Sequence, residues 1–185
     1  NVHVKDILEQ HFKLPTLVDN NVNTLALGEY WFGCGRDKNV QELVYIFCSE
    51  GVGGGIITSG NLLRGKDNIA AEIGEMIINI EDNATRGRLE DYCSTDVVEA
   101  VTNLDFEEAC KRALKGDKQC RDAIERAIKA LGVGIVNITS ILNPEIIVVS
   151  GKFVDAYPPF LSEAEKYARS RMASDLAQKV QIIKR

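Results

Sequence analysis

The sequence predicts an α/β fold in which helices flank a sheet, and three observations support this class. Residues 43–48 and 146–149 are continuous apolar runs of strand length, as in strands buried on both faces. Between them, apolar residues recur at alternating steps of four and three from Ile124 to Leu142, which is the pattern of a long helix with one apolar side. Strand and helix patterns alternate along the chain, as they do in α/β proteins.

The composition is that of a globular chain with room for one good-sized core, since 45% of the 185 residues are hydrophobic and 26% are charged. The 22 basic and 27 acidic residues include no basic run, so this segment is a poor candidate for gripping a nucleic-acid backbone. No apolar run approaches the roughly 18 residues of a membrane span, and no secretory signal is visible. The five cysteines form no CxxC pair, so we expect reduced, buried thiols and a cytoplasmic protein without a membrane partner.

The first forty residues are expected to form a helix, a short strand and a second helix. The spacing of apolar residues predicts an amphipathic helix over residues 2–13 and a strand over 16–19. Asparagines crowd the start of the next helix, where an N-cap is wanted, and that helix is predicted over 21–33. The polar residues 36–41 mark a predicted boundary between two lobes.

A glycine-rich turn follows the first apolar strand, which is predicted over 42–48. Gly51, Gly53, Gly54 and Gly55 supply backbone that can take positive φ and approach another group closely. A second strand is expected directly after them. Such a turn can cradle a phosphate, because its N–H groups converge on an anion, and it can equally be a plain hairpin.

The rest of the chain is predicted to alternate loops, helices and strands. Gly132 and Gly134 interrupt the long helix, and we expect them to permit its close packing against the sheet. The remaining predicted elements are a loop over 61–68, a strand over about 72–80, a polar turn over 81–88, helices over 89–103, 105–114, 117–142 and 158–171, and strands over 146–149 and 180–183.

Four sequence blocks occur in a fixed order: NNVNTLALGE at 20–29, SEGVGGGI at 49–56, AEIGEM at 71–76 and NPEIIVVSG at 143–151. They resemble NDANAAALGE, GTGIGGGI, GEIGHM and NPEIIVLGG, which are blocks of the ROK family of sugar kinases and sugar-responsive repressors. Order and spacing match throughout, so the resemblance covers nearly the whole chain. It implies an actin-like, ribonuclease H-like sugar kinase lobe with a mixed sheet flanked by helices.

The resemblance also implies a domain organisation. Residues 1–38 would be the last helix, strand and helix of the first lobe, and 39–185 the second lobe. The family's opening phosphate loop, its closing helix and the helix-turn-helix domain of its repressors would lie outside this sequence. Since the sequence opens on Asn1 rather than Met, we expect it to be a piece of a longer protein.

Three positions depart from the family's kinases. Asn21 stands where they carry an Asp that acts as general base on the sugar hydroxyl, and a carboxamide cannot take up this proton; base catalysis is typically worth about 10²–10⁴-fold. Asp19 is not an obvious substitute, because a shift of one residue at a strand end points it elsewhere. Glu50 replaces a Thr and would face a triphosphate with like charge. The resulting degenerate phosphate turn comprises Glu50, Gly51, Gly53 and Gly54.

The third departure concerns zinc, which many relatives bind with a His of GEIGH and with cysteines. Glu75 takes the position of this His, and residues 81–90 contain no cysteine. A structural zinc site wants four nitrogen or sulfur ligands. We therefore expect no metal site, and no nucleotide or other cofactor.

A set of polar groups suited to a sugar remains. Glu72 and Glu90 match sugar-binding glutamates of the family's GEIGH and GCLE blocks, and Glu75 stands at a sugar-contacting position. Carboxylates can accept hydrogen bonds from pairs of vicinal hydroxyls. A straight strand would turn Glu72 and Glu75 to opposite faces, so a bulge at Gly74 is expected to bring them to one side. The predicted sugar-binding residues are Asn20, Asn21, Glu72, Glu75 and Glu90. The alternatives are a helix cap for Asn21 and solvated surface carboxylates for the glutamates.

The resemblance implies the sugar-sensing and oligomerising part of a ROK-type transcriptional repressor, similar to xylose and N-acetylglucosamine repressors and inactive as a kinase. Its expected partners are a sugar or sugar derivative, DNA through a domain outside this sequence, and further copies of itself. The first alternative is an ATP-dependent sugar kinase, and the second is an interaction module that binds no ligand.

Overall fold

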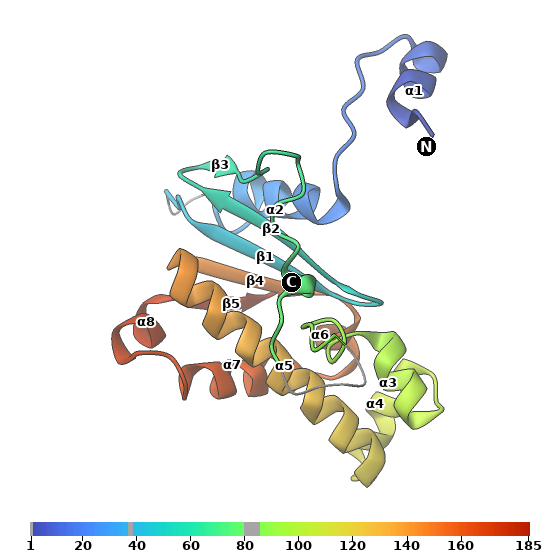
Figure 1. The fold of residues 1–185 in the computed structure, drawn as a ribbon, viewed down its shortest axis with the longest axis vertical. Coiled ribbons are helices and arrows are strands. Elements are labelled where there is room, and N and C mark those ends of the chain that lie inside the picture. The colour runs from blue at the N-terminus through green and yellow to red at the C-terminus, as the bar shows by residue number, and fades with distance from the viewer. Residues whose placement is uncertain (1, 37–38, 80–85) are drawn as a thin grey trace.

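The structure is a computed structural model that describes residues 2–36, 39–79 and 86–185, and a five-stranded mixed sheet lies at its centre (Figure 1). The strand order is β3-β2-β1-β4-β5, with β1 antiparallel to β2 and parallel to β4. The strands are β1 Leu43–Cys48, β2 Val52–Thr58, β3 Asn61–Leu62, β4 Ile146–Ser150 and β5 Gln181–Lys184. The predicted fold class, a mixed sheet flanked by helices, is confirmed.

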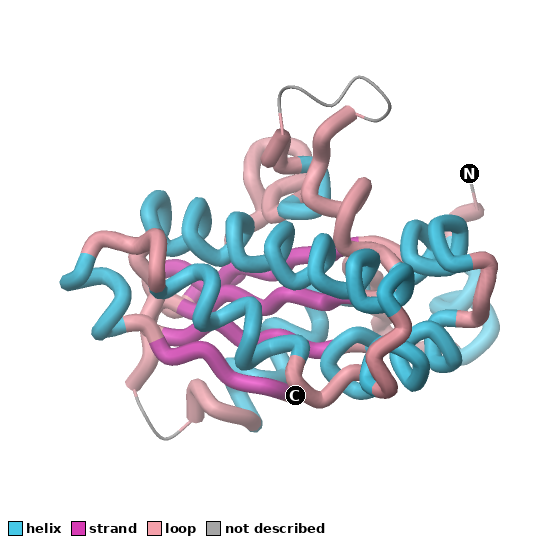
Figure 2. Tube along the Cα trace, turned by 90° about the horizontal axis from the view of Figure 1, so that it is seen from below, coloured by secondary structure: helices cyan, strands magenta, loops and turns pink. Residues whose placement is uncertain are grey.

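Helices cover both faces of this sheet. Helix α2 (Asn21–Phe32) lies on one face, where Leu43 and Tyr45 of β1 join its core. Helices α5 (Lys118–Leu142) and α7 (Phe160–Arg169) lie across the other face, as Figure 2 shows for the helices in front of the strands. Because alternate residues of β1 enter the two cores, the strand is apolar throughout, as the sequence predicted.

Shorter helices complete the second face. They are α3 Thr95–Thr102, α4 Phe106–Leu114, α6 Lys152–Ala156 and α8 Ser174–Lys179. The starts of α4 and α5 are capped by aspartates: Asp105 accepts from the Glu107 and Glu108 amides, and Asp117 accepts from the Cys120 amide. Helices α6 and α8 were not predicted, and the helix expected from residue 89 begins only at residue 95.

The two glycines inside α5 do not face the sheet, contrary to the prediction. A Cβ added to Gly132 would lie 2.6 Å from the Tyr167 ring of α7, and one added to Gly134 would lie 3.0 Å from Leu89. The glycines therefore let α7 and the segment around Leu89 approach α5 closely.

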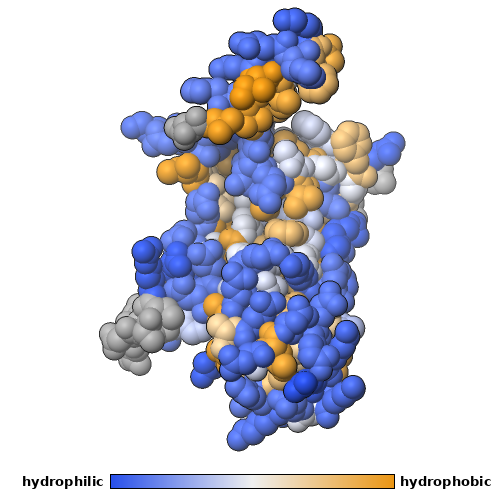
Figure 3. Space-filling model, turned by 90° about the vertical axis from the view of Figure 1, so that its right-hand side faces the viewer, coloured by the Kyte–Doolittle hydropathy of each residue, from blue (hydrophilic) through white to orange (hydrophobic). Residues whose placement is uncertain are grey.

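Helix α1 (Val4–Phe12) forms as predicted but buries none of its residues and stands away from the sheet (Figure 1). The predicted strand over 16–19 is wrong, because this extended segment pairs with no described strand. Figure 3 shows hydrophobic side chains gathered at the top of the molecule, over α1 and the chain that follows. The exposed apolar residues there are Val2, Val4, Ile7, Phe12, Leu14, Leu17 and Val18.

The predicted strand over 72–80 is also wrong. Residues Ile73–Glu75 form a 3-10 helix, and a single bridge then pairs Ile77 with Arg88. Ile80 and most of the predicted turn lie outside the described residues. The predicted loop over 61–68 holds the short strand β3. The alternation of apolar residues was misleading, because among the described residues the pairing of this segment is limited to that one bridge.

Helix α2 belongs to the same packed body as the sheet, although the resemblance assigned it to the first lobe. The predicted division at residue 38 stays a prediction. The five cysteines are free thiols, and four of them are buried. Within the described ranges, the helices lack the combination of length and apolar character that a membrane span requires.

Candidate functional site

The β1–β2 hairpin carries the glycine-rich segment, but only part of that segment is a turn. The Ser49 amide donates to the Gly51 carbonyl at 3.0 Å, which closes the turn around Glu50. Gly53 and Gly54 lie inside β2, paired with Phe47 and Ile46, and so are wrongly placed in the predicted turn. Gly51 and the three glycines of β2 do not use the positive φ that glycine allows.

These strand glycines serve close approach instead, as expected from the missing side chain. A Cβ on Gly53 would lie 2.6 Å from Val22 of α2, and one on Gly55 would lie 2.7 Å from Ala26. A Cβ on Gly54, on the opposite face, would lie 2.5 Å from the Ala71 carbonyl oxygen. The three glycines thus let α2 and the segment before the 3-10 helix press on β2 from both sides.

Asn20 and Asn21 lie at the start of α2, directly before the contact with Gly53. Asn20 is the N-cap, and both carboxamide oxygens accept from the Val22 amide, at 2.8 and 2.9 Å. Both side chains are exposed, and their amide nitrogens have no acceptor among the described residues. The capping alternative named Asn21, but the N-cap is Asn20 and Asn21 is the first helical residue. The carboxamide nitrogens of both remain available to a ligand.

Asp19 is tied into the same helix start. Its carboxylate lies 2.5 Å from Nη2 of Arg64 and accepts from the Asn23 carboxamide at 3.0 Å and from the Asn20 amide at 2.8 Å. Hydrogen bonding from Arg64, opposed by burial, lowers the pKa of Asp19 to about 2. The carboxylate closest in sequence to Asn21 is therefore held firmly in its ionised form.

A 3-10 helix stands where the bulge was predicted, with Glu72 at its N-cap and Glu75 as its last residue. Glu72 precedes the helix with non-helical dihedrals of φ −71° and ψ 62°. The bulge at Gly74 was wrong, and the expected placement of the two carboxylates on one side stays a prediction. Glu72 is exposed, and in the described part of the chain its carboxylate has no hydrogen-bond or ion-pair partner.

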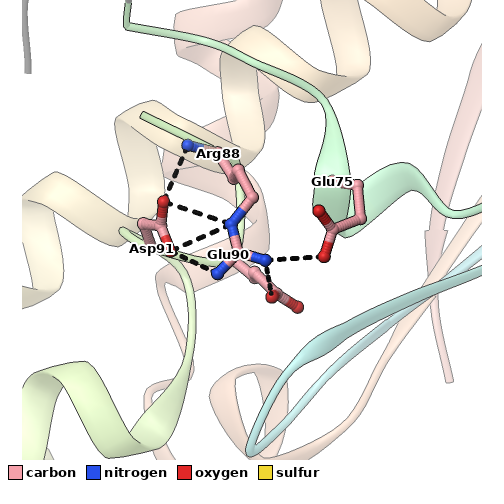
Figure 4. A network of polar contacts seen from close by, with 4 residues as sticks. All are labelled: Glu75, Arg88, Glu90 and Asp91. Carbon is pink, nitrogen blue, oxygen red and sulfur yellow. Dashed lines mark hydrogen bonds and ion pairs between the residues drawn. The ribbon is translucent and has the colours of Figure 1, made fainter. Parts of the chain in front are cut away.

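Arg88 gathers three carboxylates around one guanidinium (Figure 4). Its Nη1 lies 2.6 Å from Glu75 Oε1 and 2.9 Å from Glu90 Oε1, and its Nη2 lies 2.8 Å from Asp91 Oδ1. These partners, led by the hydrogen bonds to Asp91, raise the pKa of Arg88. Arg88 therefore brings together two of the five predicted sugar-binding residues.

Glu90 also reaches the hairpin. A Cβ on Gly74 would lie 3.1 Å from Glu90 Oε2, and one on Gly51 would lie 3.6 Å from it. Oε2 of Glu90 thus lies close to Gly51 of the hairpin and to Gly74 of the 3-10 helix, while Oε1 pairs with Arg88.

Glu50 points to a different partner. Its carboxylate accepts from Lys152 at 2.5 Å, which lowers the pKa of Glu50 to about 2. Lys152 follows Gly151, whose φ of 108° turns the chain at the end of β4. A cavity of about 410 Å³ beside it is lined by Phe106, Glu107, Lys111, Lys152, Asp155 and Ala156, and it includes none of the predicted sugar-binding residues.

The structure therefore brings some of the predicted residues together and not others. The asparagines are neighbours at the start of α2, whose Val22 packs on Gly53, and Arg88 joins Glu75 and Glu90 beside Gly74 and Gly51. Glu72 makes no hydrogen bond or ion pair with either group among the described residues. No contact joins the two groups among the described residues. Sequence reasoning missed the three cations that hold the carboxylates: Arg64, Arg88 and Lys152. Local patterns gave no signal for them, because two of the three pair with residues far away in the sequence.

The zinc that the resemblance implies for many relatives does not fit these side chains. Glu75 takes the position of the His, and Arg88 takes the position of the Cys in GCLE, so a carboxylate and a guanidinium pair where two zinc ligands would stand. A cation would be repelled by Arg88. Within the described ranges, no group of three or more His, Cys, Asp or Glu side chains is placed to hold a metal.

Comparison with known proteins places this arrangement in a family. A model of the ROK family matches residues 1–185. The chain is 31% identical to the xylose repressor of Caldicellulosiruptor bescii, over 82% of this chain and 43% of that protein. It is 32% identical to the glucokinase of Halalkalibacterium halodurans, over 92% of this chain and 60% of that protein.

The fold agrees with the sequence comparison. The crystal structure of a ROK family transcriptional regulator, a homologue of the Escherichia coli MLC protein, superposes with a TM-score of 0.84 and 22% identity. The match covers all of this chain and 51% of that one. The chain spans about half the length of the curated relatives it matches. With the family model matching over its whole length, the chain belongs to the ROK family.

Proposed function

We propose that this chain is the sugar-sensing part of a ROK transcriptional repressor that does not phosphorylate its sugar. The effector is a sugar or sugar derivative that contacts Asn20, Asn21, Glu72, Glu75 and Glu90. The full-length protein binds DNA through a helix-turn-helix domain and works in the cytoplasm as a homo-oligomer. Relatives named as xylose repressors support the regulatory reading.

The observation that carries the proposal is the lack of a usable base at the start of α2. Asn21 cannot take up a hydroxyl proton, and its carboxamide oxygen already accepts from the Val22 amide. Asp19 is neutralised by Arg64, and with a pKa of about 2 it is a very weak base. Recognition without turnover is the chemistry that these residues suit.

The hairpin turn supports the same reading. Lys152, a cation beside the turn, is engaged by Glu50 at 2.5 Å. A nucleotide phosphate would have to displace this carboxylate and then sit next to it. Since like charges at short range repel, the turn favours a structural hairpin over a phosphate cradle.

The polar groups of the predicted site match hydroxyl chemistry. The Asn20 and Asn21 nitrogens can donate hydrogen bonds, and the carboxylates of Glu72, Glu75 and Glu90 can accept them from hydroxyls. Hydrogen bonds with charged acceptors are each worth about 1.5–3 kcal/mol. A neutral sugar with neighbouring hydroxyls suits such acceptors.

The sensing step would be a closure around the hairpin. Helix α2 rests on β2 through the glycine contacts, and Glu90 approaches Gly51 of the same hairpin. A sugar bound by both groups favours the arrangement in which they are closest, and it acts only through its difference in affinity between the two arrangements. Hinge closure of this kind alters dimer geometry and releases the operator.

The test uses the full-length protein and calorimetry with xylose, glucose and N-acetylglucosamine. We expect one of these sugars to bind and no phosphorylated sugar to form when ATP is added. Glu90→Gln should weaken binding by about tenfold or more, since it removes a charged acceptor. Glu108→Gln is the matched control, because Glu108 pairs with Arg112 on α4 at 2.9 Å.

A sugar kinase is the second candidate, and the similarity to a glucokinase favours it. Phosphorylated sugar made by the wild-type protein, with ATP consumed in step, would overturn the proposal. Activity gained only in Asn21→Asp would support it, because it would show that the base alone was missing. Absence of binding by all three sugars would favour an interaction module.

A further inference from the structure

The nitrogens of the Arg88 guanidinium bind different carboxylates. Nε and Nη2 both donate to Asp91, at 3.2 and 2.8 Å from Oδ1, while Nη1 is shared by Glu75 and Glu90. Figure 4 shows Arg88 between Asp91 and Glu75, with Glu90 beside it. A planar guanidinium held on one edge can present its remaining nitrogen in only a narrow range of directions.

Asp91 is the anchor of this unit. It is the least exposed of the three carboxylates, with 12% of its side chain accessible, and it also accepts from the Arg88 backbone amide at 2.9 Å. The hydrogen bonds from Arg88 lower the pKa of Asp91, so the anchor stays ionised. Asp91 and Arg88 therefore form a local pair that does not depend on Glu75 or Glu90.

Backbone hydrogen bonds and side chains both join the two segments that carry Glu75 and Glu90. Backbone hydrogen bonds that link the segment 74–79 to 87–90 include the Ile78 and Asn79 amides to Gly87, the Leu89 amide to Met76, and the Glu90 amide to Gly74, at 2.8, 3.1, 2.8 and 3.1 Å. They include just one strand-like bridge in the described residues. The Arg88–Glu75 ion pair spans the same two segments with side chains.

Glu75 and Glu90 come from these two segments and would repel each other without the cation between them. Nη1 of Arg88 meets one oxygen of each, and the second oxygen of Glu90 is left over Gly51 and Gly74. The cation therefore fixes where the acceptor oxygens stand relative to the hairpin.

We infer that Arg88 is a positioning residue of the sugar site: anchored by Asp91, it holds the Glu75 and Glu90 carboxylates side by side to receive the hydroxyls of the ligand. This inference rests on the proposed function, because it takes a sugar as the ligand. The contacts of Arg88 with Glu75, Glu90 and Asp91 do not depend on a ligand. The site then discriminates between sugars by the placement of hydroxyls, because its acceptors cannot swing to follow a different pattern.

The experiment compares Arg88→Gln and Arg88→Lys with the wild type in the full-length protein. Calorimetry measures affinity for the sugar of the panel that binds and for its monodeoxy analogues, and hydrogen exchange follows the Leu89 and Glu90 amides. Arg112→Gln on α4 is the matched control. Arg112 forms an ion pair with Glu108, at a distance of 2.9 Å, and this pair is not part of the proposed site.

In Arg88→Gln we expect affinity to fall about tenfold to a hundredfold, the loss typical of a removed charge-assisted hydrogen bond. Discrimination between the sugar and its deoxy analogues should shrink as well, which a general loss of stability would not cause. The Leu89 and Glu90 amides should exchange faster, while β1 and β4 amides stay unchanged. Arg88→Lys should recover part of the affinity, since an ammonium cannot reach all three carboxylates at once.

Wild-type affinity and unchanged discrimination in Arg88→Gln would overturn the inference and leave the proposed function standing. Should no sugar bind to the wild type, the proposed function fails, and hydrogen exchange then decides the inference by itself. Equal exchange of the Leu89 and Glu90 amides in wild type and Arg88→Gln would overturn it in that case.

Discussion

Single side chains at this site are governed by the cations that pair with them. Asp19, Glu50 and Glu90 are each paired with a basic residue, whereas Asn21 carries no charge. The sequence predicted the polar character of these positions correctly, because residue type is printed in the chain. It could not predict Arg64 or Lys152 as partners, since they lie 45 and 102 residues away from the acids that they bind.

The Asp19–Arg64 pair predicts a dependence of stability on pH. The pKa of Asp19 is depressed from 3.8 to about 2 in the fold, so the pair stabilises the fold above about pH 4 and this contribution is lost as pH falls toward 2. At pH 7, Asp19→Asn should lower the free energy of unfolding by about 0.2–1 kcal/mol, as for other partly exposed pairs. Urea denaturation of the wild type and of Asp19→Asn measures the difference in the free energy of unfolding at pH 7 and at pH 2.5.

At pH 2.5 the difference between Asp19→Asn and wild type should shrink. Asp122→Asn is the control, because Asp122 is exposed on α5 and its carboxylate makes no ion pair in the described ranges. An Asp19→Asn penalty that is equal at both pH values would show that charge is not what the site contributes.

Whole elements were predictable where the signal was long and periodic. The stripe of α5 and the apolar runs of β1 and β4 were read correctly, because each is fixed by burial along its entire length. The segment 72–80 was misread, since its apolar alternation reflects a 3-10 helix and one bridge to Arg88 rather than a ladder. Apolar alternation within a segment does not show whether a partner strand is present to form a ladder with it.

The glycines of β2 make an element-scale prediction about close packing. A Cβ on Gly55 would lie 2.7 Å from the Ala26 Cβ and 2.8 Å from the Val22 carbonyl oxygen, so α2 would have to move away from the sheet. Gly55→Ala should therefore lower the free energy of unfolding by about 1–3 kcal/mol. Chemical denaturation monitored by the fluorescence of Trp31 on α2 measures this change.

Gly28→Ala is the matched control for this substitution. Gly28 lies inside α2, and nothing would come within 4 Å of its added Cβ, so the variant should gain about 0.5–1 kcal/mol from helix propensity. If both variants were equally stabilised, the contact between α2 and β2 would be looser than the structure has it.

At the scale of the molecule, stability is distributed unevenly between α1 and the packed body. Helix α5 buries a continuous stripe against the sheet, whereas α1 buries no residue and presents Ile7 and Phe12 to solvent. The same residues that make α1 amphipathic in the sequence thus find no core in this chain. The sequence predicted the helix correctly because periodicity is local, but it could not say whether its apolar side is covered.

This contrast predicts the pattern of hydrogen exchange in the 185-residue chain. Isolated helices shorter than about 12–15 residues are marginal in water, and α1 has nine residues, so its amides should exchange almost as fast as those of an unfolded peptide. Amides in the middle of α5, such as that of Leu131, should exchange only on global unfolding.

Helix α2 is the internal control, since it is similarly short but packs on the sheet through Val22 and Ala26. Exchange measured by mass spectrometry at two protein concentrations separates the possibilities: protection of α1 equal to that of α2 at both concentrations would contradict the prediction, and protection that grows with concentration would mean that its apolar side is buried between copies of the chain.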